Sequence, residues 1–137
     1  MLLRGKAVSM IYILLNLVPI LLATLAGLAV GALWLWIAGL RLPGLVATIT
    51  ITAAEFWFAA ILAGALILAP PKASPWVMAI GSAVVIWIGF VAPATIVTHA
   101  ARRAGVGTAL LDCLHWLALM VVQALVLKSI GLVPPPV

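Results

Sequence analysis

The sequence predicts an all-α membrane protein whose four transmembrane helices form one bundle joined by short loops. Of the 137 residues, 68% are hydrophobic and only 7% are charged, and a water-soluble fold of this size cannot bury so much apolar surface. Four apolar stretches are each long enough to cross a bilayer core of about 30 Å as a helix. Helices are expected rather than strands, because each backbone group must find a hydrogen bond within its own segment in lipid.

The first two spans are expected at about 14–38 and 45–69. The first apolar run exceeds the roughly 7 to 15 residues of a cleavable signal peptide, so we expect a retained span preceded by an N-terminal extension at 1–13. The segment "GLRLPG" ends this span, and the prolines of "PPKASP" end the second, because proline cannot continue a helix.

The last two spans are expected at about 75–100 and 108–130. Ser74 followed by Pro75 is a typical helix start, and Gly131 followed by "PPP" is a typical end. Residues 1–137 then form one domain of a multi-pass protein in the cell (inner) membrane, with both termini on the same side, which we expect to be the cytoplasm. The bases favour this orientation only slightly by the positive-inside rule: Arg4, Lys6, Lys72 and Lys128 lie on the terminal side, and Arg41, Arg102 and Arg103 on the other.

Small residues predict where the helices pack. Ala23, Gly27 and Gly31 follow one another at four-residue spacing in the first span, and such stripes let helices approach closely in lipid. We expect them to pack within the chain, with a homodimer face as the alternative. Gly89 and Pro93 complete the expected packing set in the third span, where proline should kink the helix.

The tryptophans near the span ends have a separate interpretation. Trp34 and Trp36 close the first span and Trp76 opens the third. These positions are typical of the aromatic belts at the two membrane interfaces. We therefore expect all three side chains at the level of the lipid headgroups.

The ionisable residues inside the spans are expected to form an intramembrane polar cluster of Glu55, Asp112, His115 and His99. Glu55 and Asp112 are the only acidic residues of the chain, and a charge that faces lipid costs about 2.5 to 3.5 kcal/mol. A helical period puts Asp112, His115 and Gln123 on one face of the fourth span, which should point into the bundle. Glu55 lies near mid-membrane, where its carboxyl must be protonated, paired or wetted.

Each of these residues also has a structural interpretation. His99 could serve as a helix C-terminal dipole partner or a headgroup contact. Asp112 could pair with Arg102 or Arg103, and His115 could bond to Asp112 or to a neighbouring helix. Arg41, Arg102 and Arg103 are expected to contact lipid headgroups or a partner protein.

Several classes of site are not expected. Metal-binding helix motifs are absent and Cys113 is the only cysteine, so we predict no metal site. No cofactor is predicted, and a tetrapyrrole held by His99 or His115 is the weaker alternative. The chain lacks a basic face interleaved with aromatic residues, so no nucleic-acid partner is expected. It also lacks the spacings of nucleophilic, phosphate-binding or dinucleotide-binding sites, so we do not expect an enzyme.

Two stretches resemble a known family. "LNLVPILLATLAGLAVGALWLWIAGL" and "GFVAPATIVTHAARRAGVGTALLDCLHWLALMVV" are similar to the first and the last part of the bacterial "domain of unknown function 1761" membrane proteins. The matching positions are Asn16, Gly31, Trp34, Gly89, Phe90, Pro93 and Asp112. Leu35 and Leu17 replace aromatic residues of that pattern, and the order of His115 and Trp116 is reversed. The resemblance implies four membrane helices and no particular activity.

Three functions follow from these observations. The leading hypothesis is a protein that acts through helix contacts, either as an accessory or assembly subunit of a membrane complex or as a homo-oligomer, with the lipid bilayer and another membrane protein as partners. The alternative is a small proton- or cation-coupled transporter that uses Glu55. The third is a lipid-acting enzyme in which Asp112 orients His115 as a base and the arginines hold a phosphate.

Overall fold

The computed structural model describes residues 11–136 and confirms the predicted all-α fold. Its helices are α2 (Leu17–Ile37), α3 (Leu45–Leu68), α4 (Pro75–Ile86), α5 (Ala92–Ala101) and α6 (Val106–Ile130), with a π-helical turn η1 (Trp87–Val91) between α4 and α5. No strand occurs in the described part of the chain. The segment from α4 to α5 counts as one span, so four helical segments among residues 11–136 are long and apolar enough to cross a membrane. The chain is thus a multi-pass membrane protein.

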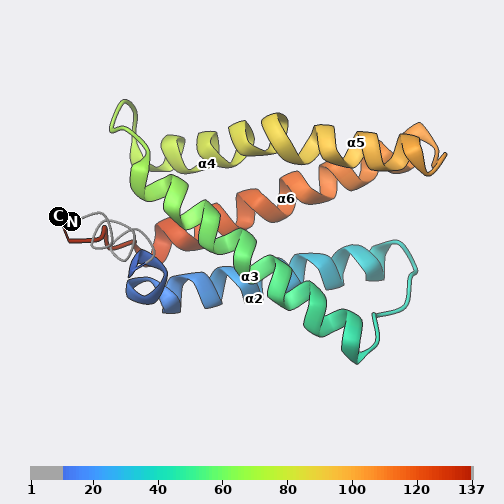
Figure 1. The fold of residues 1–137 in the computed structure, drawn as a ribbon, viewed down its shortest axis with the longest axis horizontal. Helices are drawn as coiled ribbons and strands as arrows, with labels where there is room; N and C mark the ends of the chain where they lie inside the picture. Colours follow the sequence, from blue (N-terminus) through green and yellow to red (C-terminus); the bar gives the residue numbers. More distant parts are fainter. Residues whose placement is uncertain (1–10, 137) are drawn as a thin grey trace, which may run out of the picture.

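The spans lie side by side in an open bundle (Figure 1). α6 packs against α2 on one side and against the α4–η1–α5 segment on the other, while α3 crosses α2. The start of α2 and the end of α6 lie at the same end of the bundle, which we call the terminal end. The α2–α3 and α5–α6 loops lie at the opposite end, which we call the arginine end because it carries Arg41, Arg102 and Arg103.

Small side chains form much of the bundle core. Ala59, Ala60 and Ala63 of α3 are completely buried, as is Ala23 of α2. They lie in one cluster with larger buried side chains, chiefly Ile20, Leu62, Met120 and Leu127. Van der Waals contact is the main source of helix association in lipid, so these alanines let the larger side chains of the facing helices fill the space between them.

α2 and α5, which both end at the arginine end, have the same C-terminal capping motif. Beyond α2, Leu40 donates its backbone N–H to Leu35 O and Gly39 donates to Trp36 O; beyond α5, Ala104 donates to His99 O and Arg103 to Ala100 O. These are the two hydrogen bonds of a Schellman motif, which needs a left-handed residue just after the helix. Gly39 (φ 66°) fills that position in one case and Arg103 (φ 55°) in the other.

The sequence predicts a kink in the third span at Pro93. The structure has a π turn at Trp87–Val91, which ends two residues before Pro93. The Thr95 hydroxyl donates to the Val91 carbonyl at 2.8 Å within this region. Gly89 and Pro93 do not pack against another helix, which corrects the expectation for these two positions. Both are exposed, and a Cβ added to Gly89 would meet nothing within 4 Å.

A buried asparagine joins the two ends of the described chain. Asn16 lies between a helical segment at 11–15 and α2, and its side chain is 1% exposed. Its Nδ2 donates to the carbonyls of Tyr12 and Val133, both at 2.8 Å, and its Oδ1 accepts the Val133 N–H at 2.7 Å. The extended segment after α6 is thereby held against the start of α2.

The first half of α3 separates from the rest of the bundle. Leu45 and Val46 are 77% and 79% exposed, whereas Ala59 and Ala60, further along the same helix, are fully buried. Figure 1 shows the amino end of α3 projecting away from α6. The divergence opens a space between α3 and α2 toward the arginine end.

Candidate functional site

A cleft of about 630 Å³ lies between the carboxyl half of α2 and the amino half of α3. His115 and Trp116 of α6 contribute to its wall, and Leu42 and Pro43 of the α2–α3 loop line it at the arginine end. Most of the other lining side chains are aliphatic. Glu55 is the only acidic residue in the lining, so we call this space the Glu55 cleft.

The carboxyl of Glu55 reaches from this cleft into the bundle core. It is 5% exposed, and Oε2 is buried with no hydrogen-bond partner in the described structure. Oε1 lies 4.0 Å from the position that a Gly31 Cβ would occupy, and Gly31 lines the cleft. One carboxyl oxygen therefore faces the cleft side, and the other faces the interior.

Gln123 of α6 lies at the interior oxygen. Its side chain is completely buried, and neither Nε2 nor Oε1 has a hydrogen-bond partner among residues 11–136. A Cβ at Gly27 would lie 2.7 Å from Nε2 of Gln123 and still closer to Oε2 of Glu55. Both atoms thus lie against the same point of the α2 backbone, and the absent side chain of Gly27 makes room for them. The amide N–H group is the natural donor for this carboxyl oxygen.

Aromatic rings surround the polar part of the cleft. The Trp34 and His115 ring centroids are 5.2 Å apart, and those of His115 and Trp116 are 5.8 Å apart. Trp116 also packs on Phe58 at 5.7 Å. Nδ1 of His115 is buried with no hydrogen-bond partner in the described part of the chain. Trp34 therefore lines the Glu55 cleft and contacts His115 of α6, an environment that its place at the span end did not predict.

Asp112 pairs with His99, not with either arginine. His99 Nε2 and Asp112 Oδ2 are 2.8 Å apart, and His99 Nδ1 lies 2.8 Å from the Thr95 carbonyl oxygen. A carbonyl oxygen only accepts, so Nδ1 is a donor, and Nε2 must also donate if Asp112 is ionised. The pair joins the end of α5 to the start of α6 at the arginine end.

The predicted polar cluster therefore divides into two parts. Glu55 and His115 line the cleft, whereas His99 and Asp112 form a joint between two helices. The pair expected for a base and its orienting carboxylate is not formed, because Asp112 bonds to His99 and His115 Nδ1 has no partner in the region described. Gln123 shared the predicted inward face of α6, but only the structure brings it to Glu55.

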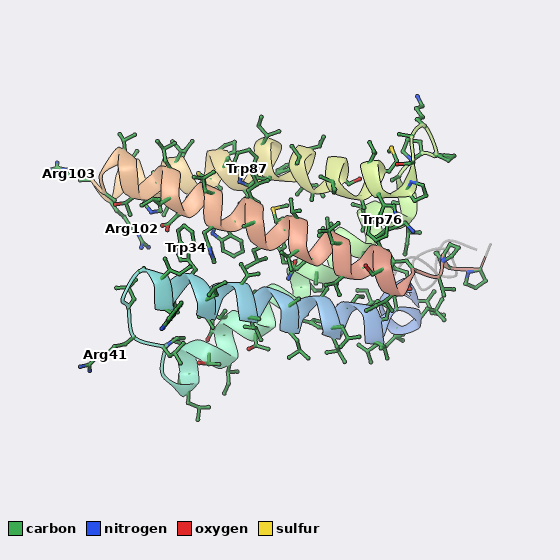
Figure 2. All side chains as sticks on the ribbon, turned by 180° about the vertical axis from the view of Figure 1, so that it is seen from behind. Trp34, Arg41, Trp76, Trp87, Arg102 and Arg103 are labelled. Atoms are coloured by element: carbon green, nitrogen blue, oxygen red, sulfur yellow. The ribbon has the colours of Figure 1, made fainter. Side chains whose placement is uncertain are left out.

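The arginines lie together at one end of the molecule. Figure 2 shows Arg41, Arg102 and Arg103 at the arginine end, Trp34 near them, Trp87 further along the bundle and Trp76 toward the terminal end. All three arginines are exposed. Their contact with lipid headgroups or with a partner protein stays a prediction. Two of the other basic residues, Arg4 and Lys6, lie outside the described residues.

Three further tryptophans, Trp57, Trp76 and Trp87, have distinct environments. Trp87 donates its indole N–H to the Cys113 carbonyl at 2.8 Å and so ties η1 to α6. Trp76 lies under the Lys128 ammonium, which is 5.4 Å from the ring centroid, a distance typical of a cation–π contact. Trp57 is 53% exposed and faces outward.

The residues present offer little to a metal or a tetrapyrrole. No group of three His, Cys, Asp or Glu side chains comes together among residues 11–136. Both ring nitrogens of His99 are within hydrogen-bond distance of protein oxygens, so a tetrapyrrole iron would have to displace one of these contacts. His115 keeps a ring nitrogen without a partner in the described structure, but that atom is buried.

The fold and site define a multi-pass four-helix membrane protein with a carboxyl-bearing cleft between two of its spans. Comparison with protein families, with curated proteins and with solved structures returned no match to this chain. The resemblance to the family named above therefore stays a prediction, and the function must be argued from the site.

Proposed function

We propose that the protein is a small proton-coupled transporter that binds a lipid-soluble ligand in the Glu55 cleft. The observation that carries this proposal is the position of Glu55: an intramembrane carboxyl that lines an open cleft, with one oxygen buried and without a hydrogen-bond partner in the described structure. Ionisable groups inside membranes are costly and are typical of ligand and proton pathways. The other acid, Asp112, already has a partner in His99.

Competition at one carboxyl is the proposed coupling mechanism. When Glu55 holds a proton it is neutral, and when it releases that proton it attracts a positively charged or hydrogen-bond-donating ligand. A group that binds two ligands in competition couples their free energies reciprocally. A proton gradient would therefore favour loading of the cleft on one side of the membrane and unloading on the other.

The amino half of α3 is the element we expect to move. It shares little surface with the bundle, as the exposure of Leu45, Val46 and Ile49 indicates. A displacement of this half changes the width of the cleft and breaks few packing contacts, which is the usual property of gating segments.

The proposal is tested by uptake into proteoliposomes with an imposed pH difference. Three probes with the same hydrocarbon body are supplied in turn: adamantanamine, adamantanol and adamantane carboxylate. The accumulated amount is measured by mass spectrometry of the vesicle contents, after subtraction of the accumulation in protein-free vesicles. We expect the wild-type protein to accumulate at least one probe and Glu55→Gln to accumulate none.

Asp112→Asn is the matched control, because it removes the other acid of the chain from a position outside the cleft lining. It should retain uptake, with folding of both variants checked by thermal unfolding. Wild-type protein that accumulates none of the probes, or Glu55→Gln that transports as well as wild type, would contradict the proposal.

A second candidate, the helix-contact function predicted from the sequence, is favoured by the same exposed half of α3. Three of its large apolar side chains, Leu45, Val46 and Ile49, are at least 60% exposed, so a neighbouring helix from a second copy or from a larger complex could cover them. Extraction in mild detergent followed by native mass spectrometry tests this. A particle with the mass of one chain and no partner excludes this candidate.

A further inference from the structure

We infer that the Glu55 cleft selects lipophilic amines and binds them as ammonium ions. The inference rests on the proposed function and names the chemical class of its ligand. It is carried by the polar groups of the site, by the rings around them, and by the dimensions and charge of the route to it.

The polar groups require a donor. Oε2 of Glu55 and Nε2 of Gln123 lie against the same point of α2 at Gly27, and neither has a hydrogen-bond partner in the described structure. The other oxygen faces the Gly31 side of the cleft. Carboxylate oxygens only accept, and an ammonium group offers up to three donors together with the opposite charge. An alcohol offers one donor and no charge, and a carboxylate ligand would be repelled.

The walls favour an organic cation rather than a metal ion. Trp34 and Trp116 line the cleft on either side of His115, and indole faces attract cations at short range. Hard metal ions take about six or more oxygen ligands. The lining offers them the Glu55 carboxyl and the hydroxyls of Thr48 and Thr50, which donate to carbonyls of their own helix.

The size of the cleft fits an organic molecule with an apolar body. Its volume of about 630 Å³ lies within the roughly 300–1,000 Å³ of pockets that bind drug-sized ligands. Apart from the polar and aromatic residues already named, its lining is aliphatic, with Leu28, Leu35, Leu42 and Ile51 as the larger side chains. Such walls bury a hydrocarbon body while the nitrogen lies at Glu55.

The arginines favour entry through the lipid. Arg41, Arg102 and Arg103 lie at the arginine end, where Leu42 and Pro43 line the cleft, and their field repels a cation that approaches from water at that end. An amine can enter the bilayer as its uncharged base. At a protonated Glu55 the O–H bond then breaks and an N–H bond forms, which leaves an ammonium ion next to a carboxylate.

The test is binding of the three adamantane probes to the purified full chain in detergent, measured through the tryptophan fluorescence of the cleft. We expect the wild-type protein to bind adamantanamine at least about tenfold more tightly than adamantanol and to bind adamantane carboxylate most weakly. In Glu55→Gln the preference for the amine should fall to within about twofold, with the affinity for adamantanol unchanged.

Trp34→Leu serves as a second variant that keeps the carboxyl, and covers the case that Glu55→Gln fails to fold. This substitution should weaken the binding of adamantanamine more than that of adamantanol, because only the cation loses an attraction to the ring. Equal weakening of both affinities contradicts the inference. If adamantanol binds wild-type protein as tightly as adamantanamine, the inference is overturned while the transporter proposal survives. If no probe binds and none is accumulated by proteoliposomes, both are overturned.

Discussion

At Gly27, one missing Cβ determines where two buried polar side chains lie. The Glu55 and Gln123 side-chain ends occupy the space that any larger residue would fill, whereas the neighbouring Gly31 has 4.0 Å of room toward Glu55. The two glycines share one helix and one four-residue spacing, yet only the first is required by a close contact. The GxxxG pattern alone does not distinguish them.

Gly27→Ala should therefore be less stable than Gly31→Ala by about 1–2 kcal/mol, since overpacking a filled site forces side chains to move. Both substitutions gain the same helix propensity, which makes Gly31→Ala the matched control. Thermal unfolding of both variants in the same detergent measures the difference. Equal midpoints would show that Glu55 and Gln123 move aside freely, contrary to this expectation.

Among the elements, the end of α5 contains a residue that its conformation disfavours. Arg103 has a φ of 55° at a position where the equivalent turn after α2 uses Gly39. A left-handed conformation costs a residue with a side chain roughly 1–2 kcal/mol. The loop closes nonetheless because Ala104 and Arg103 both donate to carbonyls of α5.

Arg103→Gly should accordingly stabilise the protein by about 1 kcal/mol, because glycine adopts this conformation without strain. Arg102→Gly is the control: Arg102 has a φ of −87°, so the same change of residue relieves no strain there and should not stabilise. Unfolding midpoints of the two variants and the wild type provide the comparison. A stabilisation of similar size in both variants would mean that loss of positive charge, and not relief of strain, is the cause.

At the scale of the whole molecule, Asn16 connects the two ends of the described chain. Its side chain forms three hydrogen bonds. One reaches Tyr12, four residues before Asn16, and two reach Val133, 117 residues after it. Asn16→Ala should lower the free energy of unfolding by about 1–3 kcal/mol, since it removes three hydrogen bonds of a buried side chain, two of them to Val133. Hydrogen exchange should show faster exchange of the Val133 amide, whose N–H loses its acceptor.

Ser129→Ala is the matched control for this prediction. Its hydroxyl donates only to Leu125 within its own helix and is exposed, so neither stability nor the Val133 amide should change appreciably. Unchanged exchange at Val133 in Asn16→Ala would show that the end segment is held by other contacts.

The spans could be predicted from the sequence because each depends on local information. Bilayer thickness determines their length, and prolines and glycines mark where they end, so α3 begins at Leu45 as expected and ends one residue before the predicted boundary. The sequence also indicates that the polar residues of the spans face the bundle, since a charge that faces lipid is costly whichever residue would pair with it.

The pairing of side chains could not be predicted in the same way. Whether His99 faces Asp112 depends on how α5 is rotated about its own axis. The π turn at Trp87–Val91 changes this rotation from that of a regular α-helix. The cleft depends on the angle at which α3 crosses α2. Glu55, Gly27 and Gln123 each attract attention in the sequence, but no spacing rule connects three residues on three different helices.

The Asn16 contact also has a consequence for biosynthesis. Asn16 precedes the first of the four spans, whereas Val133 follows the last. During most of chain elongation, the side-chain amide of Asn16 therefore has only Tyr12 as a partner, although it is buried in the finished fold. The second set of bonds forms only after α6 has crossed the membrane in the correct direction and delivered Val133 to the terminal end. A chain that inserts its last helix the wrong way cannot complete them, and closure of this contact thereby distinguishes finished topologies from failed ones.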